Sequence, residues 1–136
     1  MLATIKNVTI DNNNEELVNF AQTIDFTELF NHTKEAMKVE CNFYQPEITT
    51  TRGDVYIRFM SDDITSQTGA FAGILKNCCI SSFSNGIHKD KETGEPSYWV
   101  QVNIQYSHKN GGSNGMEVVT AWYDNTKGWT FRNAGM

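Results

Sequence analysis

The stretch YWVQVNIQY, residues 98–106, alternates between apolar and polar side chains along most of its length. Successive side chains of a β-strand point to opposite faces of a sheet, so this alternation predicts a strand with one buried face. The buried face would carry Tyr98, Val100, Val102, Ile104 and Tyr106. The opposite face would carry Trp99, Gln101, Asn103 and Gln105, and the sequence raises the question of what that face does.

The segments around this stretch have the composition of neighbouring strands. Residues 78–89, 115–124 and 128–132 are rich in β-branched and aromatic side chains. Turn-forming clusters at 90–96, 110–115 and 124–128 separate them. Residues 54–60 also alternate, with Val55, Ile57 and Phe59 on one face. The sequence therefore predicts a curved antiparallel meander of four to five strands.

The register of the segment 115–124 stays open. One row contains Met116, Val118, Thr120 and Trp122, and the other contains Glu117, Val119, Ala121 and Tyr123. A shift of one residue across the preceding glycine-rich loop would exchange the row that joins the core.

The N-terminal half has helical periodicity. A first helix is predicted from Leu17, Phe20, Ala21 and Ile24, which fall at i, i+3, i+4 and i+7. A second helix is predicted from the face formed by Phe26, Leu29, Phe30, Thr33 and Met37, with Asp25 and Glu28 as a capping arrangement. The sequence leaves open whether a break at residues 23–25 separates the two helices or whether they form one kinked helix. A short edge strand is expected at 3–10, and a third helix at 61–77.

These elements predict one α+β domain over residues 1–136, in which N-terminal helices pack on the meander. A chain of this length can bury a sufficient core without disulfides. The three cysteines are an odd number and include an adjacent pair, which indicates reduced thiols.

The negative charge is concentrated in the first half. The net charge is −5; residues 1–63 hold eleven acids and five bases, whereas residues 64–136 hold five acids and six bases. No broad basic surface is expected, so direct nucleic-acid binding is disfavoured. An acidic surface is complementary to a basic protein or nucleoprotein.

The sequence contains no segment with the features of a signal peptide or of a membrane-spanning helix. We therefore expect a cytoplasmic protein without a membrane partner. The abundance of asparagine and the two prolines are compatible with a low-GC bacterium or its phage, so the compartment would be a bacterial cell or a phage-infected host.

Gly128 and Trp129 follow a turn and lead into Phe131 in the last strand. Together with the predicted order of two helices, a strand, a helix and a curved meander, this ending resembles that of NTF2-like (cystatin-related cone) proteins. The resemblance implies a cone that can hold a small molecule. Members of that superfamily include isomerases, cyclases, hydrolases and non-catalytic protein-binding modules, so the resemblance does not select one function. No catalytic residue is transferred to this chain.

The sequence offers no recognisable catalytic or metal-binding arrangement, which favours a protein that is not an enzyme and has no cofactor. His32, His88 and His108 are far apart, and Cys78 and Cys79 would point to opposite faces of a strand. Asp62 and Asp63 are explained by the start of the third helix. The aromatic residues near the C-terminus fit cross-strand packing, although they could also stack on a flat ligand.

Two functional hypotheses remain. The first is a non-catalytic acidic protein that binds a macromolecular partner, in the manner of phage or mobile-element inhibitors of host machinery such as anti-CRISPR proteins. Its predicted partner-binding residues are Glu15, Glu16, Asp25, Glu28, Trp99, Gln101, Asn103 and Gln105. An exposed aromatic row would also suit a homodimer.

The second hypothesis is an NTF2-like protein or enzyme with a small molecule in its cone. Its predicted pocket is lined by Tyr56, Trp99, Tyr123 and Trp129, with Gln101 and Asn103 beside them. It requires an ionisable group inside the cone, for which the nearest candidates are Asp54, Asp124 and His88.

Overall fold

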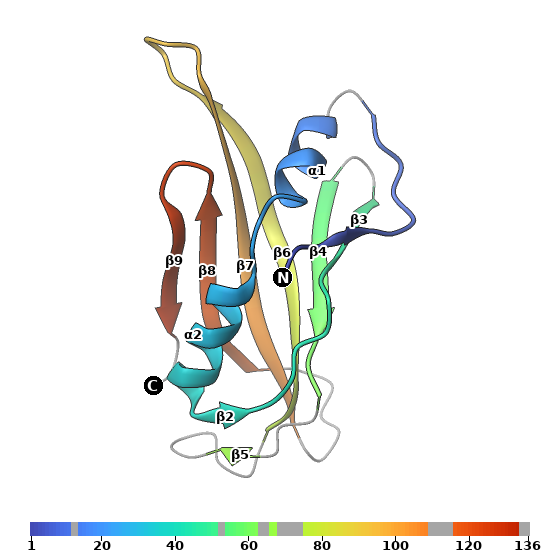
Figure 1. The fold of residues 1–136 in the computed structure, drawn as a ribbon, viewed down its shortest axis with the longest axis vertical. Helices are drawn as coiled ribbons and strands as arrows, with labels where there is room; N and C mark the ends of the chain where they lie inside the picture. The colour runs from blue at the N-terminus through green and yellow to red at the C-terminus, as the bar shows by residue number, and fades with distance from the viewer. Residues whose placement is uncertain (12–13, 52–53, 63–65, 68–74, 109–115, 134–136) are drawn as a thin grey trace.

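The computed structural model describes residues 1–11, 14–51, 54–62, 66–67, 75–108 and 116–133. Two helices, α1 (Glu15–Ala21) and α2 (Thr27–Met37), lie on one side of a long curved sheet (Figure 1). The chain therefore breaks between two separate helices, as one of the two sequence alternatives predicted. Within the described residues, neither helix has the length and apolar character needed to cross a membrane.

The main sheet has seven strands in the order β1-β3-β4-β6-β7-β8-β9. Their bounds are β1 (Thr4–Ile5), β3 (Glu47–Thr51), β4 (Asp54–Met60), β6 (Leu75–Lys89), β7 (Pro96–His108), β8 (Met116–Asp124) and β9 (Gly128–Asn133). All neighbours are antiparallel except β1 and β3, which are parallel. Two short strands, β2 (Val39–Glu40) and β5 (Ser66–Gln67), form a separate pair.

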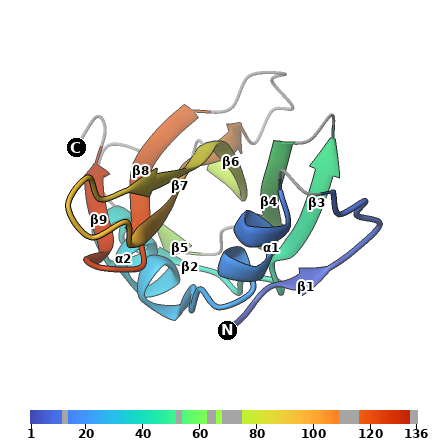
Figure 2. The same cartoon turned by 90° about the horizontal axis from the view of Figure 1, so that it is seen from above.

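The predicted α+β class is confirmed, because the N-terminal helices cover a curved antiparallel sheet. Figure 2 shows the strands curving around α1 and α2. The predicted meander corresponds to β4, β6, β7, β8 and β9, and the predicted edge strand to β1. The sequence missed β3, because its residues EITTT contain a single large apolar side chain, Ile48, and show no clear alternation.

The core lies between the helices and the concave face of the sheet. Val100, Val102 and Ile104 of β7 are almost fully buried, which confirms the aliphatic row as the core face. Ile24 and Phe26, which link the two helices, are completely buried as well. Burying one such side chain contributes about 1.5–3 kcal/mol to stability. The packing of the helices on the concave face of the sheet is therefore the main source of stability of the fold.

The register of β8 is now defined. Ile104 pairs with Val119 and Val102 with Ala121, and all four side chains are buried. The next pair is Gln105 with Glu117, so β8 holds one extra residue at this point. Because of this bulge, a strict two-residue period does not run through the pairing of the strand with β7.

The third predicted helix is wrong where the structure describes that segment. Ser66 and Gln67 form β5, and β6 begins at Leu75; residues 63–65 and 68–74 lie outside the described residues. Gly69 and Gly73 each disfavour a helix by about 1 kcal/mol, so pairing with β2 can override the weak helical pattern. The element order on which the NTF2-like resemblance rested therefore changes at this position.

The predicted capping arrangement of Asp25 and Glu28 is present only in part, because the N-cap of α2 is Phe26 and Asp25 lies one residue before it. The Oδ1 atom of Asp25 accepts a hydrogen bond from the backbone N–H of Thr27 at 3.0 Å, at the start of α2. Asp62, by contrast, does not begin a helix. Its carboxylate accepts hydrogen bonds from the hydroxyl of Tyr44 and from the side-chain amide of Asn42, which lower its pKa. Asp63 lies outside the described residues.

Candidate functional site

The polar row of β7 is part of a wider surface on the face of the sheet that points away from the helices. In this register Gln101 pairs with Trp122 of β8, and Asn103 pairs with Thr120. The guanidinium carbon of Arg132 on β9 lies 5.6 Å from the centre of the Trp122 ring. We call this the outer surface and define it as Trp99, Gln101, Asn103, Gln105, Thr120, Trp122 and Arg132.

Trp99 lies flat against a glycine of the neighbouring strand. Gly86 pairs directly with Trp99, and a Cβ atom added at Gly86 would lie 2.8 Å from the Nε1 atom of the indole. No side chain larger than hydrogen fits there unless the indole moves. Gly86 therefore gives the indole its position at one end of the outer surface.

The centre of the outer surface is more enclosed than a solvated sheet face. Asn103 is 8% exposed and Thr120 is 1% exposed, although both helices lie on the other face. The Oδ1 atom of Asn103 has no hydrogen-bond partner among the described residues. An unpaired buried acceptor costs free energy, which makes Asn103 the least satisfied position of this surface.

The residues predicted to line a ligand pocket do not converge. Tyr123 and Trp129 lie on the helix-covered face, where their ring centres are 5.1 Å apart. The Trp129 Nε1–H group donates to the carbonyl oxygen of Asp25 at 3.0 Å. Trp99 lies on the opposite face, and Tyr56 lies on β4 between the buried residues Val55 and Ile57, so it also faces away from the core. Strand alternation thus places Tyr123 and Trp129 on one face of the sheet and Trp99 and Tyr56 on the other.

The other aromatic residues near the C-terminus also pack against the protein itself. Phe131 stacks on His32 of α2 with ring centres 4.0 Å apart, and the Nε2 atom of His32 lies 2.8 Å from Oδ1 of Asn133. Trp122 is separated from this cluster because it lies on the outer surface. His32 thus joins α2 to β9.

The ionisable residues proposed for a cone lie outside the core. Asp54 and His88 are exposed. Asp124 is the last residue of β8, and its Oδ1 accepts hydrogen bonds from the hydroxyl of Thr126 at 2.7 Å and from the backbone N–H groups of Thr126 at 2.8 Å and Lys127 at 2.6 Å. Burial opposes ionisation of Asp124, but these bonds outweigh it and lower its pKa. Asp124 therefore stabilises a turn.

The four predicted acidic residues differ in what they contact. Glu15 and Glu16 in the first turn of α1, and Glu28 in the first turn of α2, are exposed and form no ion pair with another described residue. Asp25 binds the N-terminal amine of Met1 at 2.6 Å as well as Thr27, and both contacts hold its pKa well below the usual range. The three glutamates remain available to a partner, whereas Asp25 serves the fold.

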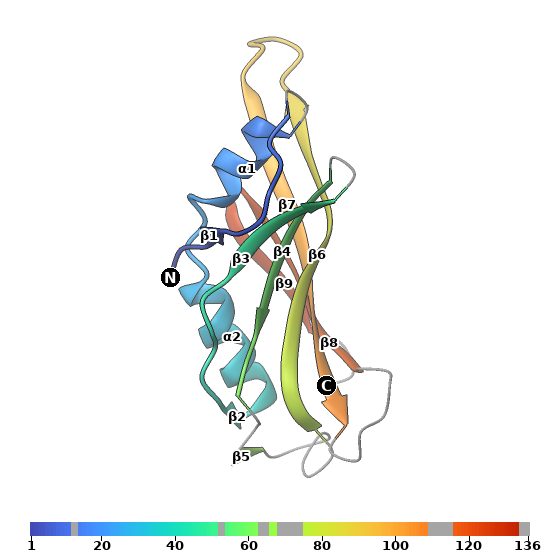
Figure 3. The same ribbon diagram turned by 90° about the vertical axis from the view of Figure 1, so that its right-hand side faces the viewer.

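The acidic residues and the outer surface lie on opposite sides of the sheet (Figure 3). The helices occupy the concave side, and the row beginning at Trp99 occupies the other. One flat partner cannot contact both at once. The structure thus divides the predicted partner-binding residues into two separate surfaces.

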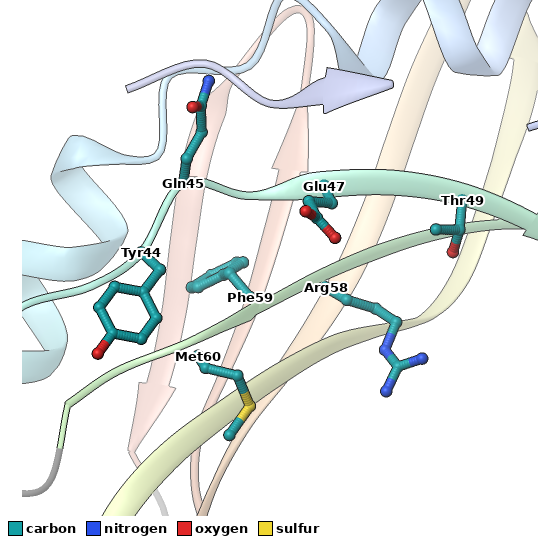
Figure 4. A pocket seen from close by; sticks show the side chains of 7 residues that line it. All are labelled: Tyr44, Gln45, Glu47, Thr49, Arg58, Phe59 and Met60. Atoms are coloured by element: carbon teal, nitrogen blue, oxygen red, sulfur yellow. The ribbon is translucent and has the colours of Figure 1, made fainter. Parts of the chain in front are cut away.

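A first hollow, of about 300 Å³, opens at β3 and β4 (Figure 4). Its lining comprises Tyr44, Gln45, Glu47, Thr49, Arg58, Phe59 and Met60. Glu47 and Arg58 are directly paired across the two strands, and Glu47 also contacts Lys6 at 3.3 Å. The hollow therefore holds charges of both signs and lacks a histidine or cysteine, so it does not form a nucleophile–base pair.

A second hollow, of about 340 Å³, lies beside α1 and is lined by Glu16, Asn19, Phe20, Thr23, Tyr98 and Asn125. We call it the α1 hollow. The sequence did not reveal it, because its walls come from residues that are about 75 to 110 positions apart. The available signal was the polar face of α1, where Glu16, Asn19 and Thr23 recur at helical spacing.

The remaining reactive side chains do not assemble into a site. Cys41 is a free, half-buried thiol whose burial raises its pKa. The backbones of Cys78 and Cys79 lie in β6, and their side chains are outside the described set. Among the described residues, no three His, Cys, Asp or Glu side chains are close enough to hold a metal ion.

Comparisons with models of protein families, with curated proteins and with solved structures found no match to this chain. The resemblance to NTF2-like proteins therefore remains a prediction from the sequence.

Proposed function

We propose that this chain is a non-catalytic binding protein whose acidic helical side contacts a basic macromolecular partner. The observation that carries the proposal is that Glu15, Glu16 and Glu28 are exposed on the two helices without an ion-pair partner among the described residues. Glu35, also exposed on α2, lies two turns after Glu28 and extends the same face of the helix.

Several separate carboxylates suit a basic partner better than a small ligand. One exposed ion pair contributes only about 0.2–1 kcal/mol, so affinity and specificity would come from several contacts over a broad surface. A like-signed group of carboxylates also accelerates encounter with a basic surface and makes binding sensitive to salt.

A basic surface of this kind is common on proteins that bind nucleic acids, because lysine and arginine neutralise phosphates. An acidic protein that covers such a surface prevents nucleic acid from binding. The proposal therefore includes an inhibitor of host nucleic-acid-binding machinery, as expected for a small phage or mobile-element protein. Direct contact with nucleic acid would be repelled by the same carboxylates.

The test is affinity capture from lysate of the source cell or its host, at low and then raised salt. We would compare the double reversal Glu16→Lys/Glu28→Lys with Glu92→Lys/Glu95→Lys, which makes the same change of charge at the exposed turn between β6 and β7. The proposal expects a partner with a basic surface that is lost with the first variant and with salt, but retained by the second. Equal retention by both variants would contradict it.

Native mass spectrometry on the same preparation would test the alternatives. A small molecule retained in the absence of any partner would favour a pocket protein and overturn the proposal. The spectrum also reports whether the chain forms a homodimer. The seven residues that define the outer surface are of the types found in interface cores, with two tryptophans, three amides and Arg132. Trp122→Ala would weaken a dimer formed through it.

A further inference from the structure

We infer that the α1 hollow receives an arginine side chain of the basic protein partner, with Glu16 as its counter-ion. The inference rests on the proposed function and identifies which of the exposed acids would make the specific contact. It concerns Glu16 because, of the predicted acidic residues, Glu16 is the one that lines this hollow.

The floor and one wall of the hollow are aromatic. Phe20 is 6% exposed and stacks on the half-buried ring of Tyr98, with ring centres 5.6 Å apart and planes inclined by 27°. Behind them Tyr123 stacks on Phe20 at 5.8 Å. A guanidinium group is planar and weakly hydrated, so it can lie against the half-buried ring of Tyr98, which is the more accessible of the two, with a favourable cation–π interaction.

The rim of the hollow is polar and carries one charge. Glu16 contributes a carboxylate, while Asn19, Thr23 and Asn125 contribute neutral amide and hydroxyl groups. Neither the carboxylate of Glu16 nor the hydroxyl of Tyr98 has a hydrogen-bond partner among the described residues. A guanidinium offers five N–H donors, which fits one carboxylate together with nearby neutral acceptors.

The wall formed by Tyr98 is held in place before any partner arrives. The Tyr98 N–H group donates to Oδ1 of Asn125 at 2.9 Å, and the Asn125 N–H group donates to the Tyr98 carbonyl oxygen at 3.2 Å. These two bonds fix the turn after β8 against the start of β7. A preformed wall lowers the cost of ordering the site on binding.

The test is an NMR titration with N-acetyl-arginine methylamide, and with the citrulline analogue as a neutral probe of nearly the same shape. We expect saturable shifts of the backbone amides of Asn19, Thr23, Tyr98 and Asn125 with the arginine probe. The citrulline probe should bind about tenfold more weakly, because it lacks the charge. Equal binding of both probes would overturn the inference.

The matched variants are Glu16→Gln and Glu28→Gln, which remove one exposed carboxylate each. Glu16→Gln should weaken the arginine probe about fivefold, whereas Glu28→Gln should leave its affinity unchanged. Tyr98→Leu, with a dispersed spectrum as the control for folding, should weaken it as well. Shifts confined to another surface, or an unchanged affinity in Glu16→Gln, would contradict the inference.

The failure of this inference is distinguishable from failure of the proposed function. A basic partner that is captured equally by wild type and Glu16→Gln, but lost in Glu16→Lys/Glu28→Lys, would refute the role of the hollow and leave the proposed function standing. A wild-type chain that retains no basic partner would refute the function whatever the titration shows.

Discussion

The concave face of the sheet is covered by two helices, whereas both helices leave the outer surface uncovered. Val102 and Asn103 are consecutive residues of β7 and are both strongly buried, but the first lies among apolar side chains and the second has an unpaired oxygen. Burial alone therefore does not identify a core. The residues that surround a buried position decide whether its burial stabilises the fold.

The largest expected effect is a difference in how much a residue from each face of the sheet contributes to the free energy of unfolding. Phe26 is completely buried and packs against Phe30, Phe59 and Trp129. We expect Phe26→Ala to lower the free energy of unfolding by about 3–5 kcal/mol. Gln105→Ala on the outer surface should change it by less than about 0.5 kcal/mol. Urea denaturation of both variants measures the difference, and similar losses would show that the outer surface supports the fold as strongly as the core.

A second substitution tests whether the outer surface is also tightly packed. Gly86→Ala places a methyl group against the Trp99 indole and should cost about 2 kcal/mol if the indole is held. In a Trp99→Ala background the same change should cost nothing or stabilise slightly, since glycine within a strand is unfavourable by about 0.5–1 kcal/mol relative to alanine. Additive losses in the double variant would mean that the two residues do not contact each other.

The smallest expected effect compares one tryptophan from each face. Trp129→Phe keeps a ring in the core but removes the hydrogen bond to the Asp25 carbonyl, so we expect a loss of about 1 kcal/mol. Trp122→Phe keeps a ring beside Arg132 and should cost clearly less, because a phenyl ring retains part of the cation–π interaction. Thermal unfolding of the two variants provides the measurement, and a larger loss for Trp122→Phe would reverse the comparison.

The candidate site could be predicted from the sequence only where it depends on local patterns. Alternation in residues 98–106 assigned the aliphatic row of β7 to the core, and the charge distribution pointed to Glu15, Glu16 and Glu28, which are exposed. The sequence could not show that Asp25 is occupied by Thr27 and Met1, because the contact to Met1 spans 24 residues. It also could not bring Tyr98 and Asn125 to α1, since that contact depends on the curvature of the sheet.

The sequence by itself determined the class of the fold, the two helices and most boundaries of the long strands, because these depend on local periodicity and turn residues. The start of β6 at Leu75 is the exception, since it falls within the third helix that the sequence predicted. Only the tertiary structure decided the register of β8, the division of the predicted pocket residues between two faces, and the position of the α1 hollow. A single extra residue near Val118 shifts the pairing of β8 with β7, and side-chain patterns do not reveal that residue. Local patterns specify elements, while pairing and curvature decide which distant side chains meet.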